Sequence, residues 1–266
     1  DCHNTGDFSF SSATTGQKYY GGLIGFARYD VTGATNVFSI SSSTNSGNLT
    51  TSASTGGETD IAGIVGYATN NIKVESCINN GTVSTSGSAT KPRVGGIVGV
   101  AHSNTKYENC TNNAAVTNAS DNGAPYIGGI AGYGNTATFS GCTNKGDVMV
   151  TKAGSNFPCI GGILGHCAAD VSVNESYNEA KISCSVNQSR LGGILGNADG
   201  VITIADCENK STAEIRNSGA SGTYVVGGIV GRIVKGGSQI LRTINRGAVK
   251  AEGNKSCLAG GIVGIS

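Results

Sequence analysis

The sequence predicts an all-β fold: a single-stranded parallel β-solenoid, in which one winding of the chain is stacked on itself about eight times. Three observations support this prediction. A five-residue phrase, Gly-Gly-aliphatic-apolar-Gly, occurs eight times, starting at residues 21, 62, 95, 128, 161, 192, 227 and 260. An Asn recurs at one fixed position in every copy, and alternating apolar and polar segments lie between these two markers. A regular spacing of about 33 residues is the sequence signature of stacked repeats.

The composition fits one elongated repeat unit and argues against several function classes. Charged residues make up 13% of the 266 residues and the net charge is +1, so neither a nucleic acid nor an anionic membrane surface is an expected partner. No apolar run approaches the roughly 20 residues of a transmembrane helix, and we expect no membrane span. The aliphatic residues recur in register, unlike those of a disordered chain. We therefore treat residues 1–266 as a single solenoid domain.

Each coil begins at the recurring Asn. A small residue, usually Gly, follows two positions later, and this pair is typical of a turn because both residues tolerate positive φ. Asn side chains stacked in register can also hydrogen-bond from one coil to the next. We therefore predict a structural Asn ladder, made of Asn4, Asn45, Asn79, Asn112, Asn144, Asn178, Asn209 and Asn245.

The rest of each coil is predicted to hold three strands. An alternating stretch follows the turn, and its first inward column runs from Phe8 to Val249. A variable polar loop leads to the glycine phrase, taken as the second strand, and a third strand, such as that around Ile72 and Val74, leads back to the turn. Neighbouring coils would pair in parallel about 4.8 Å apart. We predict a right-handed winding, the usual hand of parallel crossovers.

The second coil is longer than the others, with 41 residues against 33 in most copies. The excess lies between Phe26 and Ser43. We expect the residues in this interval, including Asp30, Phe38 and Ile40, to form an excursion from the outer surface.

The spacing of the nine Cys favours stacked thiols over a disulfide framework. Five of them share one repeat position, where the other copies carry Ser or Thr. Such a column indicates small, buried, weakly polar side chains, and buried free Cys behaves as a small hydrophobe. The column consists of Cys2, Cys77, Cys110, Cys142 and Cys207. Among the other four, a bridge such as Cys159 with Cys184 stays open.

Both faces of the glycine phrase are apolar. If the phrase is a strand, its third and fourth residues, for example Ile97 and Val98, point in opposite directions. One column would face the core, and the other would form an exposed aliphatic ridge covered by the chain's own loops or by another protein molecule. The second option predicts lateral self-association. The chain also starts inside an Asn turn and stops just after a glycine phrase, so we expect a fragment of a longer array or subunits stacked end to end.

The phrase and the Asn turn together resemble the GLUG motif. The resemblance rests on the core Gly22-Leu23-Ile24-Gly25 with its seven relatives, and on Cys-x-Asn-x-Gly, as in Cys77-Ile78-Asn79-Asn80-Gly81. GLUG repeats occur in large bacterial surface and secreted proteins, including adhesin-like proteins and the non-catalytic part of some immunoglobulin-A peptidases. The zinc motif His-Glu-x-x-His of those peptidases is absent from this sequence. The resemblance thus implies an extracellular repeat region without protease activity.

No catalytic, cofactor-binding or metal-binding signature stands out. The three His lack partners at zinc-ligand spacing, and we expect His102 and His166 on the solvated surface. A carbohydrate-cleaving β-helix would need carboxylates clustered across coils. Two pairs would stack in this way, but we interpret them as charges on a wet face: Glu75 with Glu108, and Glu175 with Asp206.

One repeat position after the phrase carries aromatic residues in several coils. Such residues can stack against a ligand. We take four residues as a candidate contact strip, which Asn197 and Arg232 interrupt further along the chain: Phe26, Tyr67, Val100 and Tyr133.

The sequence therefore predicts a non-enzymatic structural or adhesin-like module, extracellular or on the cell surface. Its expected partner is a protein or glycan of a cell surface or matrix, and no catalytic residue, cofactor or metal is predicted. Two alternatives are kept. One is a filament subunit that assembles through the ends of the solenoid, and the other is a carbohydrate-active β-helix that binds or cleaves a polysaccharide.

Overall fold

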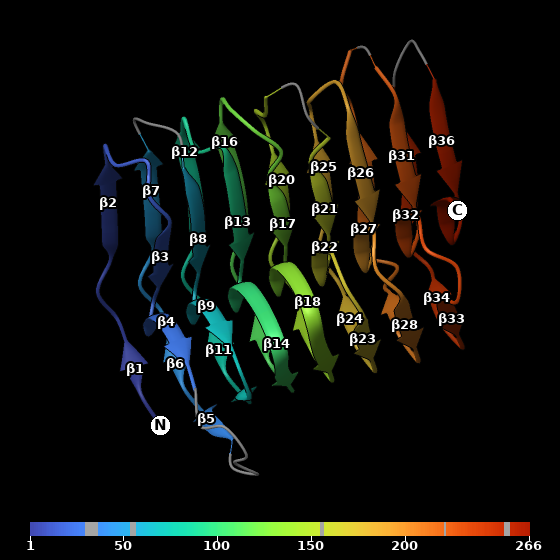
Figure 1. Ribbon diagram of the computed structural model, residues 1–266. Helices are drawn as coiled ribbons and strands as arrows, with labels where there is room; N and C mark the ends of the chain where they lie inside the picture. Colours follow the sequence, from blue (N-terminus) through green and yellow to red (C-terminus); the bar gives the residue numbers. More distant parts are fainter. Residues whose placement is uncertain (30–36, 54–56, 155–156, 221, 253–255) are drawn as a thin grey trace.

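The computed structural model shows a β-solenoid whose coils are stacked along one axis (Figure 1). It describes residues 1–29, 37–53, 57–154, 157–220, 222–252 and 256–266. Strands of neighbouring coils pair in parallel and in register, as where Asn79 pairs with Asn112. The predicted all-β parallel solenoid is confirmed. The described residues form no helix, and therefore no helix that is long and apolar enough to cross a membrane.

The coils contain more strands than the three expected. Most have five, and the strands of equivalent position form four sheets, which we call A to D. Sheet A holds the recurring Asn in a separate two-residue strand of each coil, a strand that the turn interpretation did not foresee. Its strands are β1 (His3–Asn4), β6 (Thr44–Asn45), β11 (Ile78–Asn79), β15 (Thr111–Asn112), β19 (Thr143–Asn144), β24 (Tyr177–Asn178), β29 (Glu208–Asn209) and β34 (Ile244–Asn245).

Sheets B and C also receive one strand from each coil. Sheet B is the alternating stretch after the Asn and comprises β2 (Phe8–Ser12), β7 (Leu49–Ala53), β12 (Val83–Gly87), β16 (Val116–Ser120), β20 (Val148–Val150), β25 (Ile182–Cys184), β30 (Glu214–Asn217) and β35 (Ala248–Ala251). Sheet C ends at the first residue of the glycine phrase and comprises β3 (Lys18–Gly21), β8 (Glu58–Ala62), β13 (Lys91–Gly95), β17 (Tyr126–Gly128), β21 (Cys159–Gly161), β26 (Ser189–Gly192), β31 (Tyr224–Gly227) and β36 (Cys257–Gly260).

Sheet D starts at the fourth residue of the phrase and has 13 strands. Its first arm is β4 (Ile24–Arg28), β9 (Val65–Thr69), β14 (Val98–Glu108), β18 (Ala131–Ser140), β22 (Leu164–Cys167), β27 (Leu195–Ala198), β32 (Val230–Ile233) and β37 (Val263–Ile265). The long strands β14 and β18 run on into the second arm, which otherwise consists of β5 (Phe38–Ser41), β10 (Ile72–Glu75), β23 (Val171–Asn174), β28 (Ile202–Ala205) and β33 (Gln239–Leu241).

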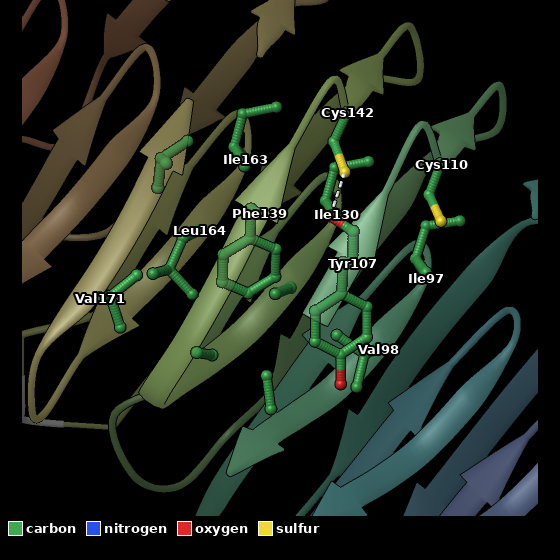
Figure 2. Packing of buried hydrophobic residues seen from close by; sticks show 14 of the residues in the cluster. Ile97, Val98, Tyr107, Cys110, Ile130, Phe139, Cys142, Ile163, Leu164 and Val171 are labelled. Atoms are coloured by element: carbon green, nitrogen blue, oxygen red, sulfur yellow. Dashed lines mark hydrogen bonds between the residues drawn. The ribbon is translucent and has the colours of Figure 1, made fainter. Parts of the chain in front are cut away.

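The glycine phrase is a bend and not a strand. Its second and third residues form the bend between sheets C and D. Because the chain turns there, consecutive residues such as Ile97 and Val98 both point into the same core and are fully buried (Figure 2). The same holds for both columns in all six inner coils. The expected exposed ridge is therefore wrong, and the lateral assembly surface inferred from it has no basis in this structure.

The apolar interior is divided into two compartments. In one compartment, the first inward column of sheet B packs with the residues that directly precede each glycine phrase, for example Val83 with Val94. The other joins the phrase to the second arm of sheet D and includes Tyr107 and Phe139, whose rings stack 5.0 Å apart (Figure 2). Full burial of an aliphatic or aromatic side chain contributes roughly 1.5–3 kcal/mol, so these columns supply most of the favourable free energy of folding.

The Asn ladder is present between the two compartments. Asn79 Nδ2 donates to Asn112 Oδ1 at 2.8 Å and to Gly81 O at 2.8 Å. The same pair of bonds recurs along the stack, and every ladder Asn from Asn45 to Asn209 is fully buried. Each amide thus satisfies a turn carbonyl within its own coil and the amide of a neighbouring coil.

The ladder packs directly against the glycine bend. A Cβ atom placed on Gly96, the second glycine of its phrase, would lie 2.3 Å from Asn112 Cγ and 2.2 Å from Gly129 O. Real Cβ atoms do not approach other atoms so closely. The Asn amide therefore occupies the space that the second glycine leaves in seven of the eight phrases, from Gly22 to Gly228.

The longer second coil is only partly an excursion. Phe38 and Ile40 belong to β5, which pairs with β10, and Ile40 is buried in the core. The segment Phe38–Ser41 is therefore a regular part of the coil. Asp30 lies outside the described residues.

The Cys residues are free thiols. No disulfide joins any of the nine, including Cys159 and Cys184. In the shared column, Cys110 and Cys142 are fully buried, and Cys110 Sγ donates to Val74 O at 3.5 Å in the preceding coil. These thiols act as small core side chains with a weak hydrogen bond, as the column of Cys, Ser and Thr predicts.

Substitution at the second glycine tests the contact between ladder and bend. A Cβ on Gly129 would lie 2.1 Å from Asn144 Cγ and 2.3 Å from Gly162 O, whereas a Cβ on Gly261 meets nothing within 4 Å. We expect Gly129→Ala to lower the free energy of unfolding by about 3 kcal/mol or more, since overpacking against backbone cannot relax. In the same 266-residue chain, Gly261→Ala should change it by less than about 0.5 kcal/mol. Urea denaturation followed by circular dichroism measures both, and equal losses would contradict the stacking described here.

Removal of one ladder amide should destabilise the whole stack. Asn112→Ala leaves Asn79 Nδ2 without one acceptor and Asn144 Oδ1 without its donor, both in a buried setting. Each orphaned buried group costs about 1–3 kcal/mol, so we expect a loss of about 2–4 kcal/mol in denaturant unfolding. The matched control is Asn113→Ala, whose side chain bonds Asn80 on the exposed side, and which should cost under about 1 kcal/mol. A control as damaging as Asn112→Ala would disprove a special role for the buried ladder.

Candidate functional site

The bend that turns the phrase into the core also brings two outward columns of side chains together. The first column, in sheet D, contains the predicted position and pairs in register as Phe26, Tyr67, Val100, Tyr133, His166, Asn197 and Arg232. The second, in sheet C two residues before the phrase, reads Tyr19, Asp60, Arg93, Tyr126, Cys159 and Arg190. We call these two columns together the aromatic strip.

Ring contacts link the two columns at the N-terminal end of the strip. The Tyr19 ring lies 5.1 Å from Phe26 and 5.2 Å from Tyr67, and Phe26 and Tyr67 lie 5.4 Å apart. The Tyr67 ring is also 6.3 Å from His102. Phe26 is 45% exposed, which leaves much of an apolar ring available for contact.

A second ring group lies in the middle of the strip. Tyr126 stacks on His166 with their centroids 4.3 Å apart, and Tyr133 lies 6.0 Å from Tyr126 and 5.7 Å from His166. The Arg93 guanidinium carbon lies 5.6 Å from the Tyr133 ring centre. These are distances at which aromatic and cation–π contacts are favourable.

The structure changes the roles of two residues considered from the sequence. Val100 is 1% exposed, so it lies beneath the surface and offers nothing to a ligand, unlike Phe26, Tyr67 and Tyr133. His166 was expected on the solvated surface, but the Tyr126 ring covers it and only 6% of it is exposed. Both residues support the strip from below.

A buried ion pair lies beside the rings. Arg93 Nε donates to Asp60 Oδ1 at 2.5 Å, and Arg93 Nη2 donates to Asp60 Oδ2 at 3.0 Å and to Glu58 Oε2 at 2.6 Å. Asp60 is fully buried. Burial raises the pKa of Asp60 to about 7, and the charge and hydrogen bonds of Arg93 oppose that rise. Arg93 is therefore held in place by two carboxylates while its edge faces Tyr133.

His166 is held as a neutral side chain. Asn197 Nδ2 donates to His166 Nδ1 at 3.2 Å and to Asp199 Oδ1 at 3.0 Å, and His166 Nε2 lies 3.6 Å from Asp199 Oδ2. Burial lowers the pKa of His166 to about 4, and the positive charge of Arg190 lowers it too, while Asp199 acts in the opposite sense. At neutral pH the imidazole therefore stacks as an uncharged ring.

Three of the four carboxylates considered for catalysis are engaged by cations. Lys73 Nζ lies 3.0 Å from Glu75 Oε2 and 2.8 Å from Glu108 Oε2, so it bridges that pair. Arg242 binds both oxygens of Asp206 at 2.7 Å. Within the part of the chain that the structure describes, no group of three or more His, Cys, Asp and Glu is arranged to hold a metal ion. We therefore take the aromatic strip, with its partly exposed rings and charged side chains, as the candidate site.

The sequence pattern revealed only half of the strip. The sheet C column was visible as one repeat position, occupied by Tyr19, Asp60, Arg93, Tyr126 and Arg190. If the glycine phrase were an extended strand, as predicted, this column would lie far from the column of Phe26. The signal that could have found them is the strict second glycine, which marks a bend where a side chain cannot fit. A bend there places the residues on either side of the phrase face to face.

Comparisons with known proteins do not add an assignment: no family model, no curated protein and no solved structure matches this chain. Function is therefore argued from the geometry of the aromatic strip.

His166 should make the protein sensitive to acid. Its folded pKa of about 4 lies below the ordinary value of 6.5, so in the window from pH 6.5 to 4 the unfolded chain binds more protons and stability falls as pH falls. The loss attributable to His166 should reach about 3 kcal/mol below pH 4. His166→Asn introduces the residue found at the same position of the next coil, Asn197. When the free energy of unfolding is measured from pH 7.5 to 4, this variant should lack the part of the acid-induced loss that His166 causes. His3→Asn, at an exposed site, is the control, and a wild-type profile parallel to that of His166→Asn would contradict the burial of a neutral imidazole.

Proposed function

We propose that this chain is a non-enzymatic, extracellular, adhesin-like repeat module that contacts a glycan through the aromatic strip. The observation that carries the proposal is the gathering of ring side chains in the two columns of the strip, with His102 beside Tyr67: Tyr19, Phe26, Tyr67, His102, Tyr126, Tyr133 and His166. Ring faces suit the apolar faces of sugar rings, and polar groups beside them fix orientation.

The repeat favours a linear polymer as ligand. Successive coils are about 4.8 Å apart, so the strip presents a ring or a polar group at each step along the axis. Tyr67 and Tyr133 lie two coils apart in one column, with Val100 below the surface between them. A polysaccharide lying along the axis would meet rings at intervals without turning.

Two features support an extracellular setting. The resemblance to GLUG repeats implies surface and secreted proteins. Seven of the nine free thiols are buried, and inert structural thiols of this kind tolerate an oxidising exterior. The proposed partner, a glycan of a cell surface or matrix, agrees with that setting.

Binding is favoured over cleavage by the state of the strip's carboxylates. Asp60 is fully buried and bound by Arg93, and Glu58 bonds the same guanidinium, so neither is free to protonate a leaving group. The filament alternative stays a prediction of the sequence.

Polysaccharide titration tests the proposal. Because the chain has no Trp, Tyr emission reports on the strip, and affinity electrophoresis through gels containing hydroxyethyl cellulose or polygalacturonate gives an independent affinity. We expect Tyr126→Ala and Tyr133→Ala each to weaken binding about threefold to tenfold, the effect of roughly 0.5–1.5 kcal/mol per ring contact. Tyr177→Ala, whose ring lies on sheet A under Lys210, is the matched control and should bind as wild type. Equal affinity of all four proteins, or binding to neither polymer, would refute a glycan contact at the strip.

A further inference from the structure

Two arginines occupy the C-terminal end of the aromatic strip. Arg190 belongs to the sheet C column and Arg232 to the sheet D column, in successive coils. Both are partly buried. The Arg190 guanidinium carbon lies 4.8 Å from the centre of the Phe157 ring. Arg190 and Arg232 stand in the same relation as Tyr126 and His166, one from sheet C and the other from sheet D of the following coil, and those two rings stack 4.3 Å apart. The register of the sheets therefore places the two arginines at neighbouring positions of the strip.

These two arginines differ from four other arginines of the chain, which are bound by carboxylates. Arg93 is bound by Asp60 and Glu58, and three further arginines pair with acidic side chains: Arg216 with Glu252, Arg242 with Asp206 and Arg246 with Glu208. Among the residues that the structure describes, neither Arg190 nor Arg232 forms an ion pair, and the Asp199 carboxylate lies 3.6 Å from His166 Nε2.

Arg190 also has an unused hydrogen-bond donor. Its Nε is buried and has no partner within the described residues. A buried donor without an acceptor is unfavourable, and so is a partly buried guanidinium without a counter-ion. An anionic ligand group would supply a counter-ion at the accessible part of the guanidinium, and guanidinium groups bind planar carboxylates through two parallel hydrogen bonds.

We propose that the strip binds an acidic polysaccharide, with a uronate carboxylate held between Arg190 and Arg232 and a neighbouring sugar ring against Tyr126 and Tyr133. The inference rests on the proposed glycan contact and specifies its ligand class. The carboxylate end of the site lies two coils from the central ring group, since Arg190 follows Tyr126 and Cys159 in the same column. The ligand therefore spans at least three coils along the axis, about 10 Å at the coil spacing.

The experiment compares one polymer in two charge states. Polygalacturonate and its carboxyl-reduced, neutral form are titrated against the wild-type chain, Arg190→Gln, Arg232→Gln and Arg190→Lys. Arg216→Gln is the matched control, because it removes one positive charge from sheet B, away from the strip. Thermal unfolding of each variant shows that it is folded, and Arg190→Lys keeps the charge if Gln is not tolerated.

We expect wild type to bind polygalacturonate at least tenfold more tightly than the neutral form. Arg190→Gln and Arg232→Gln should each lose about tenfold for the acidic polymer and nothing for the neutral one, Arg190→Lys should lose less, and Arg216→Gln should match wild type. If wild type binds both polymers equally and the arginine variants change nothing, the acidic specificity is wrong while the glycan contact stands. If wild type binds neither polymer, the glycan contact itself fails.

Two other results would overturn the assignment in different ways. A loss for Arg216→Gln as large as for Arg190→Gln would reveal general charge attraction instead of a built site. Tighter binding of dextran sulfate than of polygalacturonate, with the same dependence on Arg190 and Arg232, would replace the carboxylate by a sulfate ester as the recognised group.

Discussion

The packing of one Asn amide against one glycine backbone, repeated along the stack from Gly22 to Gly228, is the contact on which the structure depends. Asn112 fills the space above Gly96, and a side chain at Gly96 would collide with both that amide and the next coil. The same amide hydrogen-bonds to its neighbours along the stack at 2.8 and 2.9 Å. The contact therefore fixes the path of each coil and, at the same time, the register between coils. It also separates the two apolar compartments, so that each is filled by its own columns.

Recurrence of like residues was enough to predict the solenoid, because each coil contacts mainly its neighbours and places equal positions over one another. Val83 over Val116 and Asn79 over Asn112 follow directly from the period. The number of strands did not follow. A run such as Ile97-Val98 looks like a strand buried on both faces, and only the contact of Gly96 with Asn112 shows that the chain bends there. That contact joins residues far apart in the sequence, and a local pattern cannot display it.

The same omission explains why half of the aromatic strip was missed. The predicted column with Phe26, Tyr67 and Tyr133 was correct as a stack in register, yet its partners Tyr19 and Tyr126 lie on the other side of the bend. Burial could not be inferred either. Val100 and His166 share the column with Tyr133 but are buried, and the Tyr126 ring of the facing column stacks on His166. Exposure within a repeat thus depends on the neighbouring column and not on the repeat position alone.

The columns that fill the core and those outside it differ in how much their residues vary from coil to coil. The inward columns are nearly uniform, since every coil must fill the same space between the same neighbours. The sheet C column of the strip changes from Asp60 to Arg93 to Tyr126 to Cys159 to Arg190 in successive coils. Such variety leaves the coil intact because this column lies outside the two apolar compartments, but it is not random. A buried Asp60 would be strongly disfavoured without a cation, and Arg93 stands in the next coil at the position that supplies one. At these two positions the column is therefore matched from one coil to the next, and the choice of one side chain depends on the coil beside it.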